Sequence, residues 1–236
     1  MDRGIFVALS GAVLQEKRLE ILTDNLANIN TAGFKKQKPV FEDAMPNAWG
    51  LRTFASSKGV ATDMSQGVTE KTDRKLDVAI KGEGFFVVDT PNGPRYTRDG
   101  NFSMGIDGTL LTKDGYAVKG ENGVIKLATA DVTIDAEGNV KEKDVTVGKL
   151  KLVSFNRLDG LRREGGFFAP ADLTVKETKV SANTEVEQGY IEVSNVNAVR
   201  AMTTMIEAMR SYETAAKMIQ TMDEMTKKAI DDVGRV

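Results

Sequence analysis

The stretch DRGIFVALSGAVLQEKRLEILTDNLANIN, residues 2–30, carries one of the clearest patterns in the chain. Its apolar side chains recur at alternating spacings of three and four residues, with the polar Gln15 as an interruption. These positions are Ile5, Ala8, Ala12, Leu19, Leu22, Leu26 and Ile29. Asp2 can cap the start, and Asn30 followed by Gly33 supplies a stop. The pattern predicts a helix about 40 Å long, which needs a partner to cover its apolar stripe.

A second amphipathic helix is predicted at the other end of the chain, from about Ala198 to Ile230. Its stripe is Met202, Met205, Met209, Tyr212, Ala216 and Ile219, and the register then shifts to Met218, Met222 and Met225. Two interpretations remain open. The helices could form a hairpin packed on a globular core, or they could assemble with copies or relatives of the same chain. Methionine and alanine seams favour assembly, because thioethers adapt to non-identical neighbours.

The region between the helices changes to a β pattern. LDVAIKGEGFFVVD, residues 76–89, predicts a strand, a tight turn and a strand. Asp-Gly and Asn-Gly pairs then recur from Asn92 to Gly123 and again at Asp159, which is typical of short antiparallel strands. We therefore expect an α+β protein with a compact antiparallel all-β domain over 76–186.

The remaining boundaries follow from these elements. Residues 1–34 are expected to form the N-terminal helix and 187–236 the C-terminal helix. Residues 35–75 lack sustained periodicity, so they are predicted to be an extended or partly β connector. Its basic cluster of Lys35, Lys36 and Lys38 is interpreted as a solvated loop.

Composition removes several classes of function. The 236 residues include no cysteine and no histidine, which excludes disulfides, thiolate zinc sites and imidazole chemistry. A formal charge of −2 argues against a general nucleic-acid binder. No apolar run approaches the length that spans a bilayer. The N-terminal residues lack a basic leader and keep a helical stripe, so they are expected to be a mature helix and not a cleaved signal.

The motif-like fragments do not build an active site. Gly82-Glu83-Gly84 begins like a dinucleotide fingerprint, but the third glycine is missing and a hairpin turn explains it. The Asp-Gly pairs lack the ligand spacing of calcium loops. We expect no catalytic residue, no cofactor, no metal and no small-molecule substrate, and hence a structural protein.

Four motifs, in order, resemble those of the bacterial flagellar rod and hook proteins. They are NLANINTAGFK (25–35), DVAIKGEGFF (77–86), YTRDGNF (96–102) and GYIEVSNVNAV (189–199). The matching positions at the helix ends are Asn25, Asn28, Gly33, Phe34, Ser194, Asn195 and Asn197. The opening MDRGIF, the modest length and SNVNAVRAMTTMI resemble the proximal-rod branch of that family, with the distal-rod branch as the alternative.

The resemblance implies a definite architecture and setting. Its members pair the two terminal helices as a coiled coil in an inner tube and carry β domains outside. They pass through the flagellar type III export apparatus without a cleaved signal. They then assemble helically in the periplasm, with copies of themselves and other rod proteins, as a drive shaft that transmits torque to hook and filament. None of this involves nucleic acid or insertion in a membrane.

Two other classes stay open on the residues alone. One is a phage-tail-like structural protein. The other is a binding module whose loops, such as 92–101, recognise a carbohydrate or a protein, with Tyr96 and Phe102 as the nearby aromatic residues. A hydrolase that relies on carboxylates alone comes last.

Overall fold

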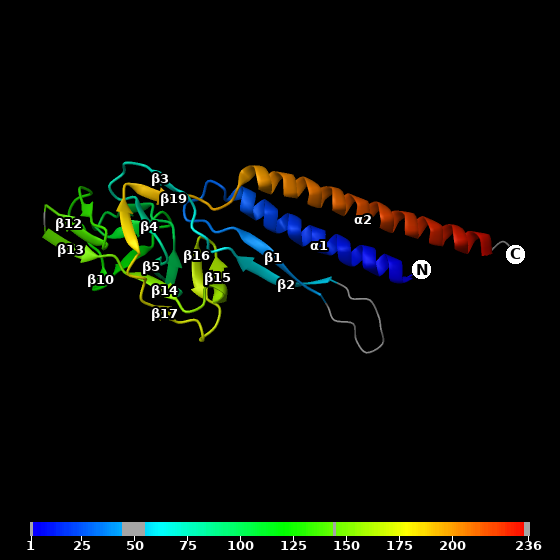
Figure 1. The fold of residues 1–236 in the computed structure, drawn as a ribbon, viewed down its shortest axis with the longest axis horizontal. Coiled ribbons are helices and arrows are strands. Elements are labelled where there is room, and N and C mark those ends of the chain that lie inside the picture. The colour runs from blue at the N-terminus through cyan, green and yellow to red at the C-terminus, as the bar shows by residue number, and fades with distance from the viewer. Residues whose placement is uncertain (1, 44–54, 144, 234–236) are drawn as a thin grey trace. The chain divides into compact units, whose positions relative to one another are not determined.

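The computed structural model describes residues 2–43, 55–143 and 145–233. The N-terminal helix α1 spans Asp2–Ala27 and the C-terminal helix α2 spans Ala198–Val233, with antiparallel strands between them (Figure 1). This confirms the predicted α+β class. The chain divides into two compact units, one made of 1–27, 37–61 and 197–236 and the other of 28–36 and 62–196.

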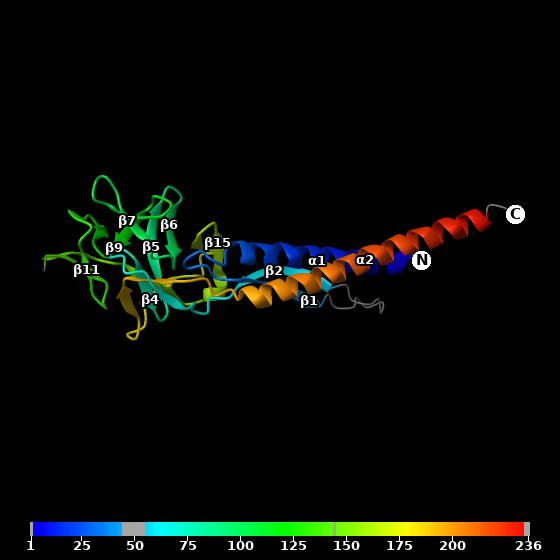
Figure 2. The same cartoon turned by 90° about the horizontal axis from the view of Figure 1, so that it is seen from above.

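The helical unit contains α1, α2 and a two-stranded sheet. The helices lie side by side (Figures 1 and 2). Strands β1 (Gln37–Asp43) and β2 (Ala55–Thr62) pair with each other, and β1 also contacts α1. The Asn25 amide fixes that contact, because its Oδ1 accepts from the Gln37 N–H at 2.7 Å and its Nδ2 donates to the Gln37 carbonyl at 2.8 Å.

The residues of the stripe predicted on α1 differ in burial. Ala8 and Ala12 are buried, Leu19, Leu22 and Leu26 are partly buried, and the side chain of Ile5 lies outside the described part of the chain. Ile29 does not belong to the helix. The structure ends α1 at Ala27, because the chain turns there and the Thr31 N–H donates to the Asn28 carbonyl at 3.2 Å.

Helix α2 begins where predicted, and Asn197 caps it. The Asn197 Oδ1 accepts from the Arg200 N–H at 2.9 Å, which satisfies one of the free donors of the first turn. The predicted stripe is divided between two faces. Met205, Ala216, Ile219 and Met222 are partly buried, whereas Met202, Met209, Tyr212 and Met225 are exposed. The most buried positions are Ala201 and Ala208, seven residues apart.

The β unit holds one large antiparallel sheet and several small ones. The large sheet runs β15-β16-β6-β5-β9-β8-β7, with β10 on β9 and β14 on β5 and β17. Its strands are β5 (Phe85–Thr90), β6 (Gly93–Thr97), β7 (Phe102–Met104), β8 (Leu110–Thr112), β9 (Ala117–Gly120), β10 (Gly123–Val124), β14 (Leu152–Phe155), β15 (Leu161–Glu164), β16 (Phe167–Pro170) and β17 (Glu177–Thr178).

Three smaller sheets complete this unit. They are β11-β12-β13, β18-β4 and β19-β3. The strands are β3 (Thr69–Lys71), β4 (Val78–Lys81), β11 (Thr133–Ile134), β12 (Asn139–Glu142), β13 (Val145–Lys149), β18 (Glu185–Gln188) and β19 (Tyr190–Glu192), and a short 3₁₀ helix covers Leu158–Gly160. The boundary predicted between 186 and 187 falls inside β18, and β19 also precedes α2.

Two apolar clusters form the core of the β unit, one on each side of β5. Phe86 packs edge-on against Phe102 in the first cluster, with ring centroids 5.1 Å apart. Phe85 packs against Phe155 in the second, at 5.9 Å, and Tyr96 also contacts Phe155. Adjacent residues of a strand point to opposite faces, so the pair Phe85-Phe86 serves both clusters.

The hairpin predicted over 76–89 is wrong in its pairing. Both strands and the turn exist, but β4 pairs with β18, whereas β5 pairs with β6, β9 and β14. The turn carries the chain from one sheet to another instead of folding it back on itself. Gly82 and Gly84 both have positive φ there, at 103° and 142°, a region that favours glycine.

Candidate assembly interface

Helix α2 exposes a second apolar stripe besides the one that faces α1. Val199, Met202, Ile206 and Met209 recur at spacings of three and four residues, and all four are exposed. The contrast between neighbours is sharp: Ala208 is 1% exposed and Met209 is 48% exposed. Farther along the helix, Met218 and Met225 are also exposed, one heptad apart.

Helix α1 exposes apolar side chains as well, at Val7, Leu9 and Val13. Exposed Leu or Met residues occur singly on most proteins, but an apolar stripe along one helix face is a candidate surface for a partner protein. We call the exposed stripe of α2, together with the exposed side chains of α1, the candidate assembly interface. It includes the predicted residues Met202, Met209 and Met225, whereas Ala8 and Ala12 are buried and Ala216 is partly buried.

A buried ionic cluster lies in the β unit, in the segments next to the helix ends. We call Lys35, Arg98 and Glu192 the Glu192 cluster; their side chains are 1%, 5% and 1% exposed. The Lys35 Nζ lies 2.5 Å from the Glu192 Oε1, and the Arg98 Nη1 lies 3.2 Å from the Glu192 Oε2. Two buried cations therefore share one carboxylate.

Backbone groups complete the coordination of the cluster. Lys35 also donates to the Ser65 carbonyl at 2.8 Å, and Arg98 donates to the carbonyls of Ile80 and Gly82. The Glu192 Oε1 accepts from the Gly67 N–H at 2.8 Å. Burial lowers the pKa of Lys35 and of Arg98, and the charge of Glu192 partly offsets this in both.

The expectation of a solvated loop at Lys35, Lys36 and Lys38 is wrong for Lys35. Its partner Glu192 is 157 positions away, so no local pattern could indicate the pair. Lys36 does stay partly exposed, where it pairs with Asp63 at 3.3 Å. In the sequence, the position of Lys35 at the end of the GFK motif was the one sign that it differs from the other two lysines.

The motif residues around the cluster hold the same segments together. Gly33 has a φ of 67°, and a Cβ there would lie 2.3 Å from the Asp99 nitrogen, so a side chain cannot be accommodated. Phe34 is buried under the Arg163 guanidinium, 4.3 Å from the ring centroid. The Asn195 Oδ1 accepts from the Lys36 N–H at 2.7 Å.

The other motif positions are local. The Asn28 Oδ1 accepts from the Thr31 hydroxyl at 3.2 Å, and the Ser194 Oγ accepts from the Val196 N–H at 3.3 Å. Together with Asn25 and Asn197, these contacts shape the turns at the ends of the two helices. Asn25, Asn195 and Asn197 accept hydrogen bonds from backbone N–H groups, as expected, whereas Asn28 accepts from a side-chain hydroxyl.

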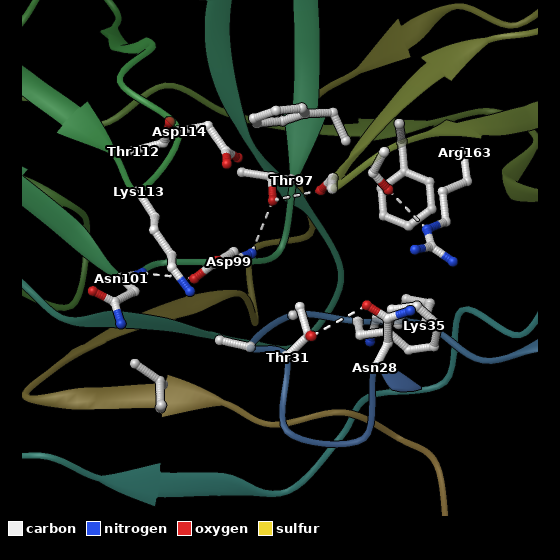
Figure 3. Close-up of a pocket in the computed structure, with 18 of the residues that line it drawn as sticks. Asn28, Thr31, Lys35, Thr97, Asp99, Asn101, Thr112, Lys113, Asp114 and Arg163 are labelled. Carbon is white, nitrogen blue, oxygen red and sulfur yellow. Dashed lines mark hydrogen bonds between the residues drawn. The ribbon is translucent and has the colours of Figure 1, made fainter. Parts of the chain in front are cut away.

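A cavity of about 490 Å³ opens beside this region (Figure 3). Asn28 and Thr31 lie on one side of it, and Thr97, Asp99 and Lys113 lie on the other. Burial raises the pKa of Asp99, although a hydrogen bond from the Asn101 N–H opposes the shift. The lining combines polar and charged side chains with the apolar Phe34, Phe167 and Phe168, so it does not indicate a particular ligand.

Comparison with known proteins gives three family matches along the chain. Residues 5–35 match the flagella basal body rod protein model, 79–142 match the D1 domain of the flagellar hook protein FlgE/F/G, and 187–232 match the C-terminal part of the flagellar basal body rod FlgEFG proteins. The rod protein FlgF of Caulobacter vibrioides is 32% identical over 246 residues, which cover the whole of both chains. The rod protein FlgG of Bacillus subtilis is 31% identical over 98% of this chain and 99% of its own.

This chain belongs to the flagellar basal-body rod protein family. As a member, it is a structural rod protein and not an enzyme. Each residue of the Glu192 cluster falls in a different one of the three matched segments. Lys35 ends the first, Arg98 lies in the second and Glu192 lies in the third.

The structure argues against the alternative of a binding module whose loops, such as 92–101, recognise a ligand. Its candidate aromatic residues, Tyr96 and Phe102, are both buried in the core, so they offer no surface to a ligand. Within the part of the rod protein that the structure describes, no helix is both long enough and apolar enough to cross a membrane.

Proposed function

We propose that this rod protein assembles helically with copies of itself and with other rod proteins through the exposed stripe of α2 and the exposed apolar side chains of α1. The observation that carries the proposal is the second stripe of α2, Val199, Met202, Ile206 and Met209, which α1 leaves exposed. In this arrangement α1 and α2 run antiparallel as a coiled coil, with Ala201 and Ala208 beside the second half of α1 and Ala8 and Ala12 beside a later part of α2 (Figure 1). The exposed methionines contact the neighbouring subunits.

The function that follows is mechanical. Helices aligned along the rod axis resist twisting, and apolar seams hold neighbouring subunits in register. The rod then transmits torque to the hook and filament by packing alone. Of the residues predicted from the sequence, Met202, Met209 and Met225 belong to the proposed interface between subunits, and the structure adds Val199 and Ile206. Ala8 and Ala12 belong instead to the seam within the chain.

The test compares two aspartate variants of α2 in cells that lack their own copy of the protein. Met209→Asp places a charge in the exposed stripe, whereas Ser211→Asp places the same charge at an exposed polar position two residues on. We expect Met209→Asp to abolish motility and the recovery of rods from isolated basal bodies, and Ser211→Asp to retain both. Normal rods with Met209→Asp would remove this stripe from the interface.

We further propose that the chain is the FlgF-type subunit and lies in the proximal rod, with the distal rod as the alternative. Identity does not separate the two, since FlgG of Caulobacter vibrioides is 34% identical over 92% of this chain. Length supports FlgF: three FlgF relatives align over 238 to 246 residues, whereas FlgG relatives align over 254 to 266. Labelling the subunit in isolated basal bodies would locate it along the rod.

Export is the remaining proposal. The likeness to the rod family supports passage through the flagellar type III apparatus and a periplasmic location, without removal of a signal peptide. Mass spectrometry of the subunit from isolated basal bodies tests this. An N-terminal peptide that includes Asp2 is expected, and a chain shortened by a signal-length segment would contradict it.

A further inference from the structure

The chain crosses between its two units at four points. These lie between residues 27 and 28, 36 and 37, 61 and 62, and 196 and 197. Three short segments of the β unit receive all four crossings: 28–36, the residues from 62 to 68, and 192–196. Any force carried by the covalent chain from the helical unit must therefore enter the β unit through these three segments.

The Glu192 cluster ties the three segments to one another. Lys35 comes from the first segment, Glu192 from the third, and the Ser65 carbonyl and Gly67 N–H from the second. Backbone bonds follow the same pattern, since the Gly33 N–H donates to the Glu192 carbonyl at 2.7 Å and the Val193 N–H donates to Val68 at 2.9 Å. Arg98 then links Glu192 to the β4–β5 turn.

The charge count of the cluster is unusual. One carboxylate with one buried cation would be balanced, but this cluster holds two cations. Buried ion pairs often add little stability compared with apolar residues, and their attested use is to specify an arrangement. Glu192 is the one carboxylate that both cations contact, while the charge of Asp63 acts on Lys35 and that of Glu83 acts on Arg98 from farther away. Removal of Lys35 would therefore leave Glu192 paired with Arg98.

We propose that Lys35 is a positioning residue that locks the three crossing segments into one junction, so that twisting force enters the β unit at a single rigid point. This rests on the proposed function of a torque-transmitting subunit. Lys35 acts through Glu192 and Ser65, and its role is to order the junction and not to stabilise the β sheet.

Hydrogen exchange on the purified full chain tests the junction directly. The informative N–H groups are those of Gly33, Lys36, Asp63, Gly67 and Val193, each of which donates across the segments. Lys35→Met removes the Lys35 cation with little change in volume and leaves Glu192 paired with Arg98. We expect exchange at these positions to accelerate about tenfold or more, while strands β5 and β9 keep their wild-type rates.

The matched control is Lys36→Met, which removes a partly exposed ion pair between Lys36 and Asp63 of the second segment. Because solvent screens a partly exposed pair, its loss should accelerate exchange at the junction far less than Lys35→Met does. Equal acceleration in Lys36→Met, unchanged junction rates in Lys35→Met, or general loss of protection in β5 and β9 would each overturn the proposal. The last result would mean that Lys35 stabilises the whole unit.

Swimming in a viscous medium supplies the second readout, with each variant as the only copy in the cell. We expect Lys35→Met to lose speed more steeply with viscosity than the wild type and Lys36→Met. Wild-type swimming with a loosened junction would also overturn the proposal. Failure of the wild-type chain itself to restore motility would instead count against the proposed function.

Discussion

The two units of this rod protein bury different chemistry. The β unit covers its aromatic and aliphatic side chains in two clusters and even covers three charges. In the helical unit, the buried positions of α2 are alanines and the exposed ones include most of its methionines. Buried alanine contributes little apolar area. The β unit therefore buries its apolar side chains within one chain, whereas the helical unit leaves an apolar stripe of α2 exposed, which we propose is covered by neighbouring subunits.

The largest effect on this contrast is expected from Glu192→Gln. The change removes the one carboxylate that both Lys35 and Arg98 contact, and breaking a buried pair costs about 3–5 kcal/mol. Urea unfolding of the purified chain should show this loss in the β unit. Glu187→Gln, on the neighbouring strand and paired with Lys81 at 3.6 Å, is the control and should cost little. A small loss in Glu192→Gln would mean that water reaches the cluster.

Two adjacent variants of α2 separate the inner seam from the outer stripe. Ala208→Asp places a charge against α1 and should melt the helical unit of the monomer, as Leu22→Asp should from the other side. Met209→Asp should leave the monomer unchanged and block assembly. In all three variants the β unit should stay folded. Circular dichroism and sedimentation velocity measure the two effects, and equal behaviour of Ala208→Asp and Met209→Asp would contradict the division into two faces.

A smaller effect is expected inside the β unit from Tyr96→Phe. The Tyr96 hydroxyl donates to the Glu177 Oε1 at 2.5 Å, and burial together with this bond raises the pKa of Tyr96. Loss of the bond should lower the free energy of unfolding by about 1.5 kcal/mol, because Lys151 still pairs with Glu177. Thermal unfolding compares it with Tyr116→Phe, whose ring packs on Phe167. A loss no larger than that of Tyr116→Phe would count against the bond.

The smallest effect on stability is expected from the protonation of Asp135 at low pH. Partial burial raises the pKa of Asp135, but hydrogen bonds from Asn139 and Lys141 outweigh it and lower the pKa from 3.8 to about 2. The folded state thus binds the proton less tightly, so this group stabilises the protein above about pH 4 and loses that effect as the pH falls toward 2. The melting temperature of Asp135→Asn should depend less on pH in that range than that of the wild type. Parallel curves would contradict the shift.

Much of the architecture could be predicted because its signals are local. The stripe of α1 needed only its own spacing, and the Asp-Gly and Asn-Gly turns needed only two residues each. Asn122-Gly123, for example, does join β9 to β10, with Gly120 opposite Gly123. Such features require no knowledge of distant parts of the chain.

What failed depended on distant partners. The two strands over 76–89 were predicted correctly, but their pairing was not. The partner of β4 is β18, about a hundred residues farther along the chain, and the sequence of the turn carries no information about that partner. The residues next to Lys35 in the sequence predict a solvated loop, but the structure buries the Lys35 side chain. On α2, periodicity identified an apolar helix but could not tell which stripe faces α1, because alanine and methionine both fit either face.

The distance along the chain between Lys35 and Glu192 also bears on how the protein folds. Contacts between residues far apart in sequence form late and slowly, because the intervening loop must first be closed. Here the intervening residues include nearly all of the β unit. The junction is therefore expected to be among the last parts to form, after residues 62–191 have found their own pairings. If the proposed export carries the chain unfolded, the Lys35–Glu192 contact can form only after both residues have emerged.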